Sequence, residues 1–262
     1  MIRGRAVSTA LLLVMSAAGL GCSKEPRPGG GAATTQPATE LTVLCGNSFV
    51  QPTEEMIEGF RKATGIAVAV TSAGSEDFLP LVKTGQRGDV LITHDPYLDY
   101  VREAKALADH CEVGFVAPVL AVQKGNPKGL TAVQDLAKPG LKVALSDPQY
   151  STCGEMVQEY LKRKDIYDAV MKNVENRLTK GHGDLGTFLK TRTVDAVIMW
   201  NGVAHTFSQS VDVVPTPYDY DRTIRVHVIG LGYSKQPESV QHFIDFARAN
   251  GPAIFVKYGY VK

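Results

Sequence analysis

The feature that most constrains the fold is an alternation of short β-branched runs with segments of helical periodicity, which begins at Leu41. Strands that alternate with helices form largely parallel sheets, because each helix carries the chain back to the edge where the next strand starts. In the first part of the chain the pattern predicts strands at 41–45, 66–71 and 90–93, and helices at 54–63, around Pro80 and at 96–104, the last with Asp95 as its N-cap. The sequence therefore predicts an α/β protein.

A second lobe is predicted after the long apolar run at residues 115–123, which we interpret as one strand that leaves the first lobe. The remaining expected elements are strands at 142–145, 196–200 and 225–232, and helices at 153–163, after Asp184, at 240–247 and at 254–258. The strand at 225–232 returns the chain to the first lobe. The prediction is two lobes, 41–119 with 223–262, and 120–222, each a mostly parallel sheet flanked by helices, with a hinge near 119–121 and 223–226.

The first 40 residues have the composition of an export signal followed by a linker. Arg3 and Arg5 precede an apolar run at 6–20, which is typical of a signal peptide. Gly21 and Cys22 resemble the end of a bacterial lipobox, which predicts cleavage after residue 21 and lipidation of Cys22. A plain signal peptide or a single membrane-spanning helix is the alternative. Residues 23–40 are rich in Pro and Gly and poor in large apolar side chains, so we expect a flexible tether.

Charge and motif content exclude several classes of function. The formal net charge of +1 and a pI near 7.7 do not favour nucleic acid or an anionic membrane as the partner. The four cysteines have no CxxC spacing, and the six histidines have no metal-ligand spacing, so we predict no resident metal or cofactor. The GxGxxG pattern at 181–186 follows a polar segment rather than a strand, which argues against a dinucleotide site. We find no hydrolase motif and expect no enzyme.

The loops that follow the predicted strands carry hydroxyl groups at the starts of helices. Ligands of open α/β sheets bind beyond the carboxyl ends of the strands, and helix N-termini attract anions through unpaired N–H groups. The loops in question are 46–48, 72–75 and 146–154. Ser48 with Gln51, and Thr152 with Glu155, also fit capping boxes. Several such helix starts around one cleft predict a site for a small oxyanion.

Five segments of the chain resemble, in the same order, the molybdate-binding proteins of ABC transporters. They are residues 41–101, which begin LTVLCGNSFVQPTEEM, and then VAPVLAVQKGNP, VALSDPQYSTCGEMVQEYL, IMWNGVA and FVKYGYVK. The resemblance covers essentially residues 41–262 and implies the type II periplasmic binding protein fold, in which two α/β lobes close over the ligand. It implies a monomeric, extracytoplasmic protein that captures molybdate or tungstate and delivers it to an inner-membrane ABC permease, and the lipobox-like end at Cys22 adds the expectation of a lipid anchor. Sulfate is expected to bind much more weakly.

The same resemblance implies a set of ligand-binding residues. Ser48 and Ser75 match two serines that bind the anion. Cys153 and Leu185 stand where a small and an aliphatic residue each offer a backbone amide. Trp200 stands in the place of a tyrosine whose hydroxyl reaches the anion.

Three departures from the family pattern leave alternatives open. Trp200 lacks a phenol, although its indole N–H can donate. Glu76 and Asp77 directly follow Ser75 and would repel a dianion if they faced it. Cys45 and Cys153, both expected near the cleft, suit a softer ligand or a metal. The alternatives are therefore another oxyanion, a small organic acid or a metal species on the same fold and, more remotely, a hydrolytic enzyme on the same scaffold.

Overall fold

The structure is a computed structural model that describes residues 40–215 and 224–261. The predicted signal peptide, Cys22 and nearly all of the predicted tether lie outside these residues. Within the described part of the chain, no helix combines the length and the apolar character that crossing a membrane requires.

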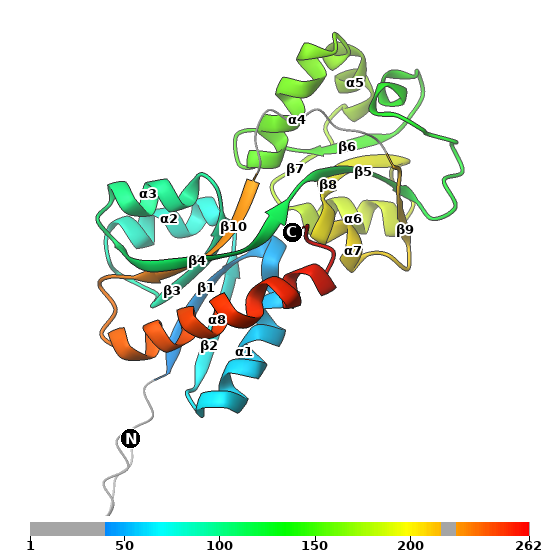
Figure 1. The fold of residues 1–262 in the computed structure, drawn as a ribbon. Helices are drawn as coiled ribbons and strands as arrows, with labels where there is room; N and C mark the ends of the chain where they lie inside the picture. The colour runs from blue at the N-terminus through cyan, green and yellow to red at the C-terminus, as the bar shows by residue number, and fades with distance from the viewer. Residues whose placement is uncertain (1–39, 216–223, 262) are drawn as a thin grey trace, which may run out of the picture. The chain divides into compact units, whose positions relative to one another are not determined.

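The first lobe is built on a five-stranded sheet. Its strand order is β2 (Val68–Ala73), β1 (Leu41–Gly46), β3 (Val90–His94), β10 (Ile224–Leu231) and β4 (Leu107–Val116). Helices α2 (Ser75–Lys83) and α3 (Tyr97–Glu103) cover one face, and α1 (Val50–Thr64) and α8 (Pro237–Lys257) cover the other (Figure 1). Successive β1 residues serve the two faces, since Val43 and Cys45 pack in one apolar cluster and Leu44 packs in the other.

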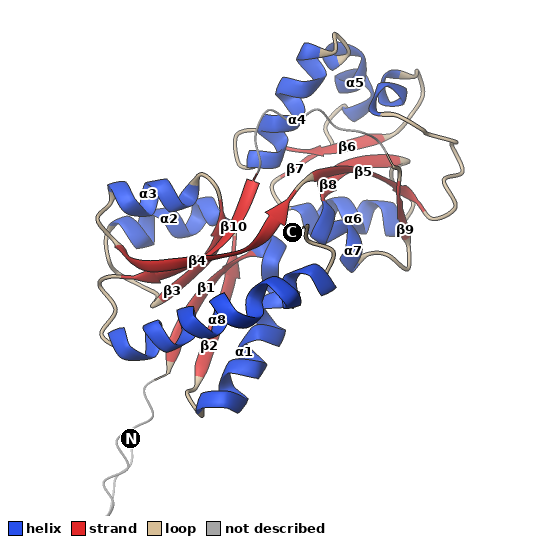
Figure 2. Ribbon diagram, in the orientation of Figure 1, coloured by secondary structure: helices blue, strands red, loops and turns tan. Residues whose placement is uncertain are grey.

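The second lobe repeats this plan. Its strand order is β7 (Leu178–Thr179), β6 (Val143–Ser146), β8 (Ala196–Trp200), β5 (Pro118–Gln123) and β9 (Val211–Val213). Helices α4 (Thr152–Arg163) and α5 (Tyr167–Val174) flank one face, and α6 (His182–Lys190) and α7 (Asn201–Thr206) flank the other (Figure 2). A short 3-10 helix at Val133–Ala137 packs beside α5.

Two α/β lobes were predicted and are confirmed, but each sheet is mixed rather than mostly parallel. In the first sheet β2, β1 and β3 run parallel, whereas β10 is antiparallel to both β3 and β4. In the second sheet β7, β6 and β8 run parallel, whereas β5 is antiparallel to both β8 and β9. The antiparallel strands β5 and β10 are the ones that follow the chain's crossings between lobes.

The single strand predicted at 115–123 is wrong. β4 begins at Leu107 and ends at Val116, and β5 begins at Pro118 in the other sheet. Ala117 between them is held by Asn201: its N–H donates to Asn201 Oδ1 (3.0 Å), and Asn201 N–H donates to its carbonyl (2.9 Å). Asn201 Nδ2 also donates to the carbonyl of Gly259 (2.7 Å), so one side chain joins the crossing to the C-terminal segment.

Two closing helices were predicted where the structure has one, α8. Gly251 and Pro252 favour a break in an isolated helix. However, the helix buries Phe243, Ile244, Ala247, Gly251 and Phe255 along its length. A Cβ at Gly251 would lie 2.5 Å from Val113 Cγ1, so the glycine lets α8 approach β4 closely. Packing against the sheet therefore outweighs local helix propensity.

The predicted N-cap at Asp95 is also wrong. Helix α3 begins at Tyr97, after a cis peptide bond between Asp95 and Pro96. The carboxylate of Asp95 instead accepts hydrogen bonds from Arg225 Nε (2.9 Å) and His227 Nε2 (2.9 Å) on β10. The side chain thus joins the end of β3 to the strand that returns from the second lobe.

Candidate functional site: a polar cavity between two lobes

A cavity of about 230 Å³ lies between the lobes. The first lobe lines it with residues 46–49, 74–77, 94 and 97, and the second lobe with residues 150–152, 180–182, 184 and 200. These segments follow β1, β2 and β3 in the first sheet and β6, β7 and β8 in the second. The cavity therefore occupies the edge of each sheet where ligands of open α/β folds bind.

Four helical segments begin at this cavity. They are the 3-10 turn Asn47–Phe49 that leads into α1, and the helices α2, α4 and α6. The first N–H groups of a helix have no partner inside the helix, and its N-terminal end carries partial positive charge. Helix starts from both lobes that line one cavity create a site suited to an anion.

The two serines predicted from the sequence both line the cavity. Ser75 is 7% exposed, and its Oγ accepts a hydrogen bond from Thr93 Oγ1 (2.8 Å), which leaves its own hydroxyl proton to donate. Ser48 lies within the 3-10 turn, and its carbonyl accepts a hydrogen bond from the hydroxyl of Tyr260. Neither serine is an N-cap, because Phe49 precedes α1 and Gly74 precedes α2, so the capping interpretation of Ser48 is wrong.

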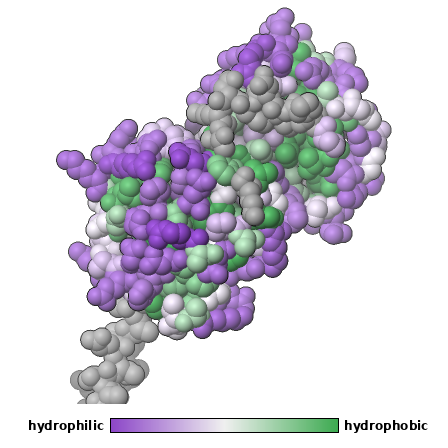
Figure 3. Space-filling model, viewed as in Figure 1, coloured by the Kyte–Doolittle hydropathy of each residue, from purple (hydrophilic) through white to green (hydrophobic). Residues whose placement is uncertain are grey.

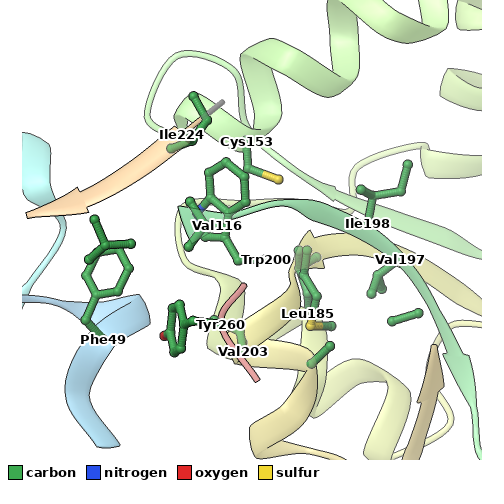
Figure 4. Close-up of a cluster of buried hydrophobic side chains, with 14 of the residues drawn as sticks. Phe49, Val116, Cys153, Leu185, Val197, Ile198, Trp200, Val203, Ile224 and Tyr260 are labelled. Carbon is green, nitrogen blue, oxygen red and sulfur yellow. The ribbon is translucent and has the colours of Figure 1, made fainter. Parts of the chain in front are cut away.

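Trp200, at the end of β8, also lines the cavity, although it is only 1% exposed. Its indole stacks on His182, with ring centroids 5.6 Å apart, and meets His94 edge-on at 5.7 Å. In Figure 4 it belongs to the same buried cluster as Phe49 and Tyr260. The indole is therefore held between aromatic rings from both lobes.

The side chains of Cys153 and Leu185 are fully buried, and among the described residues neither is part of the cavity lining. Both lie in the core of the second lobe, in the first turns of α4 and α6 (Figure 4). Their neighbours Thr152 and Asp184 line the cavity instead. Their predicted contribution was a backbone amide, and this remains a prediction.

The described cysteines have the character of core residues. Cys45, Cys111 and Cys153 are buried free thiols. Burial raises the pKa of Cys45 to about 12, and Cys45 Sγ hydrogen-bonds Thr53 Oγ1 (3.3 Å). Burial also raises the pKa of Cys153. Protonated thiols are poor metal ligands, and no cluster of three or more His, Cys, Asp or Glu residues within the described ranges is placed to hold a metal.

Charged side chains line part of the cavity and join the lobes. Lys180 Nζ, just after β7, lies 2.8 Å from Asp77 Oδ1 and 4.0 Å from Glu76 Oε1 on α2, and 5.5 Å from the ring centroid of Tyr150. Burial raises the pKa of Glu76, while a hydrogen bond to its own backbone and the charge of Lys180 act in the opposite direction. Glu76 and Asp77 therefore do face the cavity, and Lys180 partly neutralises them.

His94 and His182 are cavity residues that the sequence reasoning missed. Burial and the proximity of His94 lower the pKa of His182 to about 3, so its imidazole is neutral at physiological pH. The signal that could have found them is position: His94 ends β3, and His182 begins α6 after a glycine turn. The face drawn in Figure 3 is mostly hydrophilic, whereas these rings are buried.

Residues 41–261 match the family described as bacterial extracellular solute-binding protein. The molybdate-binding protein ModA of Mycobacterium tuberculosis is 27% identical over 190 residues, which cover 69% of this chain and 72% of the relative. The sulfate-binding protein of Escherichia coli is 28% identical over 207 residues, which cover 66% of this chain and 62% of the relative.

Solved structures share the fold at low sequence identity. The periplasmic molybdate-binding protein of Azotobacter vinelandii superposes with a TM-score of 0.70 at 17% identity, covering 85% of this chain and 99% of that one. The sulfate-binding protein SubI of Mycobacterium tuberculosis gives 0.68 at 16% identity, covering 85% and 86%. Both are type II periplasmic binding proteins, which confirms the predicted fold class.

Proposed function

Because the chain belongs to the bacterial extracellular solute-binding proteins, we propose that it captures a tetrahedral oxyanion, molybdate or tungstate, between its lobes and delivers it to an ABC permease. The family is non-enzymatic, so the cavity is a binding site rather than a catalytic one. The observation that carries the proposal is the meeting of four helix starts from two lobes on one small polar cavity.

Each proposed ligand contact has a structural rationale. The hydroxyls of Ser48 and Ser75 line the cavity and can donate to an anion. The backbone amide of Cys153 belongs to the first turn of α4, where N–H groups lack helical partners, and Leu185 stands at the end of the first turn of α6. Trp200 contributes an indole N–H in place of a phenol. The ligand would thus be held by neutral donors from both lobes.

Release and capture require the lobes to separate. We propose that residues 41–119 with 223–262 move as one lobe, and 120–222 as the other, about the crossings near 119–121 and 223–226. The ion pair between Lys180 and Asp77 joins the lobes when they are together. We also propose that Cys22 is lipidated and that residues 23–40 tether the body to the membrane. A Cys22→Ala chain that fractionates with the membrane as wild type does would contradict this anchor.

Sulfate is the second candidate, because the Escherichia coli relative is a sulfate-binding protein and matches at a similar level. A site whose buried donors fit molybdate would leave some of them unpaired around the smaller sulfate, and an unpaired buried donor is costly. We therefore expect molybdate and tungstate to bind more tightly than sulfate.

A thermal-unfolding titration tests the proposal. The compact unit Pro37–Lys262 would be titrated with molybdate, tungstate, sulfate, phosphate and divalent metals. Ligand at 100 times its Kd stabilises the folded state by about 2.7 kcal/mol, which raises Tm by roughly 5–11 °C in a domain of this size. A rise with sulfate alone selects the second candidate. An increase in Tm with a divalent metal alone contradicts the oxyanion proposal. The absence of any increase with the four anions contradicts it too.

The role of Trp200 has its own test. If Trp200 stands in for a phenol that reaches the anion, Trp200→Tyr should raise the affinity for molybdate in isothermal titration. Unchanged affinity would count against Trp200 as a ligand-binding residue.

A further inference from the structure

His182 lines the cavity with both of its ring nitrogens facing serine hydroxyls. Nδ1 lies 3.5 Å from Ser146 Oγ, and Nε2 lies 3.3 Å from Ser151 Oγ. The residue is 7% exposed, and its ring stacks on Trp200. The stack and the two hydroxyls fix the plane of the imidazole, so the remaining variable is which nitrogen carries the proton.

The Ser151 hydroxyl connects the tautomer of His182 to the ligand. Ser151 lines the cavity and is the N-cap of α4, where its Oγ accepts a hydrogen bond from the Gly154 N–H (3.3 Å). A hydroxyl has two acceptor sites and one proton. The Gly154 N–H therefore occupies one acceptor site of the Ser151 hydroxyl. The protonation of His182 Nε2 then determines whether Ser151 uses its second acceptor site or its proton toward the histidine.

The two neutral forms of His182 have opposite consequences. If Nδ1 carries the proton, the bare Nε2 accepts the Ser151 proton, and Ser151 presents only a lone pair to the cavity. If Nε2 carries the proton, it donates to Ser151, and both acceptor sites of Ser151 are filled. The Ser151 proton is then directed to the cavity, while the Ser146 hydroxyl donates to Nδ1.

We infer that His182 is a positioning residue, which carries its proton on Nε2 in the ligand-bound protein and so turns the Ser151 hydroxyl into a donor to the anion. This inference rests on the proposed function. It also specifies the class of anion: a fully deprotonated oxyanion can only accept hydrogen bonds, so it suits a hydroxyl whose acceptor sites are filled. Monohydrogen phosphate brings an O–H that Ser151 can no longer accept. This removes one acceptor that the proton could use beside the carboxylates of Glu76 and Asp77, and so lowers the affinity for phosphate.

The neutral state of the ring supports this account. His182 has a low pKa because it is buried and close to His94, so tautomer choice rather than protonation orients the serine. The arrangement supplies a directed donor without placing a positive charge in the cavity.

Nitrogen-15 NMR of the histidine-labelled full chain tests the inference directly. The His182 signals would be assigned by their loss in His182→Gln, and spectra recorded with saturating molybdate or sulfate. We expect Nε2 protonated and Nδ1 unprotonated in the complex. A complex in which Nδ1 carries the proton, or both nitrogens do, overturns the inference.

A double-mutant cycle in isothermal titration tests whether His182 acts through Ser151. His182→Phe keeps a ring to stack on Trp200 and removes both nitrogens, and Ser151→Ala removes the hydroxyl. We expect each to weaken molybdate binding about tenfold, the effect of one charged hydrogen bond, and the double variant to be no weaker than either. His182→Gln, whose amide can donate and accept, should recover part of the affinity. Multiplicative losses would mean that His182 does not act through Ser151.

The anion series separates the inference from the function on which it rests. Wild type should bind molybdate more tightly than phosphate, and His182→Phe should reduce the ratio of these two affinities. If wild type binds none of the oxyanions, the proposed function fails and the inference fails with it. If wild type binds molybdate while the ratio and the cycle show no role for His182, only the inference fails. Should His182→Phe not fold, Ser151→Ala and the tautomer measurement still decide.

Discussion

Replacing Gly154 with alanine would test how closely the start of α4 must approach the preceding loop. An ideal Cβ at this position would lie 2.5 Å from the Ser146 carbonyl oxygen, 2.9 Å from the Asp147 carbonyl carbon and 2.9 Å from the Pro148 nitrogen. All three are backbone atoms, so no side-chain rotation relieves the clash. Ordinary contact begins at 3.4 Å. To lengthen the closest of these distances from 2.5 Å to 3.4 Å, the N-terminus of α4 must move by about 0.9 Å.

The expected cost follows from that displacement. Overpacking of a buried site costs about 1–3 kcal/mol, and in a domain of this size each kcal/mol lowers Tm by roughly 2–4 °C. We expect Gly154→Ala to unfold about 2–12 °C below wild type. The same movement shifts the Ser151 cap and the first-turn amides of α4, so molybdate affinity should fall about tenfold, the value of one charged hydrogen bond.

Gly183→Ala is the matched control. Gly183 lies in the first turn of α6, and nothing is within 4 Å of an ideal Cβ there. Alanine in an unstrained helical position stabilises by about 0.4–1 kcal/mol, so its Tm should equal or slightly exceed that of wild type. Calorimetry and isothermal titration measure both variants. If Gly154→Ala unfolds and binds as Gly183→Ala does, the argument from close backbone approach is refuted.

Three further predictions concern charge at the cavity. Glu76→Gln should bind molybdate several-fold more tightly than wild type. The affinity of wild type should rise as pH falls through the raised pKa of Glu76, and this rise should be absent in the variant. Isothermal titration across pH 4.5–7 measures both effects. The pKa of His182 is about 3 in the folded protein, against an ordinary 6.5 for histidine, so on acidification the unfolded chain protonates this imidazole first. The free energy of unfolding is therefore highest above pH 6.5 and should fall by about 2 kcal/mol by pH 5. Urea unfolding of wild type and His182→Phe should show that loss only in wild type. Lys180→Gln should weaken anion binding with little change in Tm, because its pair with Asp77 is exposed and adds little to folding; an equal affinity would refute a role for Lys180 at the cavity.

Part of the site could be predicted from topology and part only from the family resemblance. Ser48 and Ser75 follow strands of one sheet, and the carboxyl ends of its parallel strands meet at one edge, so the strand pattern indicates their convergence. Trp200, the last residue of β8, was assigned to the site through the resemblance to the molybdate-binding proteins. Ser151 lies in the predicted loop 146–154 and His182 at a helix start, but the roles of these two side chains could not be found in this way. Their relevance depends on which residue is the N-cap of α4 and on two side-chain distances, and helix ends are ambiguous by a residue or two in sequence.

The errors in the fold have a common physical origin in tertiary packing. The first half of β4 has a polar sequence because β4 is an edge strand. Asp109 on this strand forms an ion pair with Arg248 of α8 (2.7 Å). Helix α8 continues through Pro252 because it packs along that same strand. Neither contact is local in sequence, so neither leaves a periodic pattern that could be recognised.

The contacts of Asn201 restrict how the lobes can move. Two covalent crossings alone would let one lobe swivel as well as bend relative to the other. Asn201 adds a third connection, since its side chain binds both Ala117 and Gly259, and Val261 beyond Gly259 pairs with Phe115 at the end of β4. If the lobes close as we propose, three attachments would suppress twisting and leave bending about one axis. The helix starts of the two lobes would then meet in the same alignment at every closure, so the accuracy of the site depends partly on the last few residues of the chain.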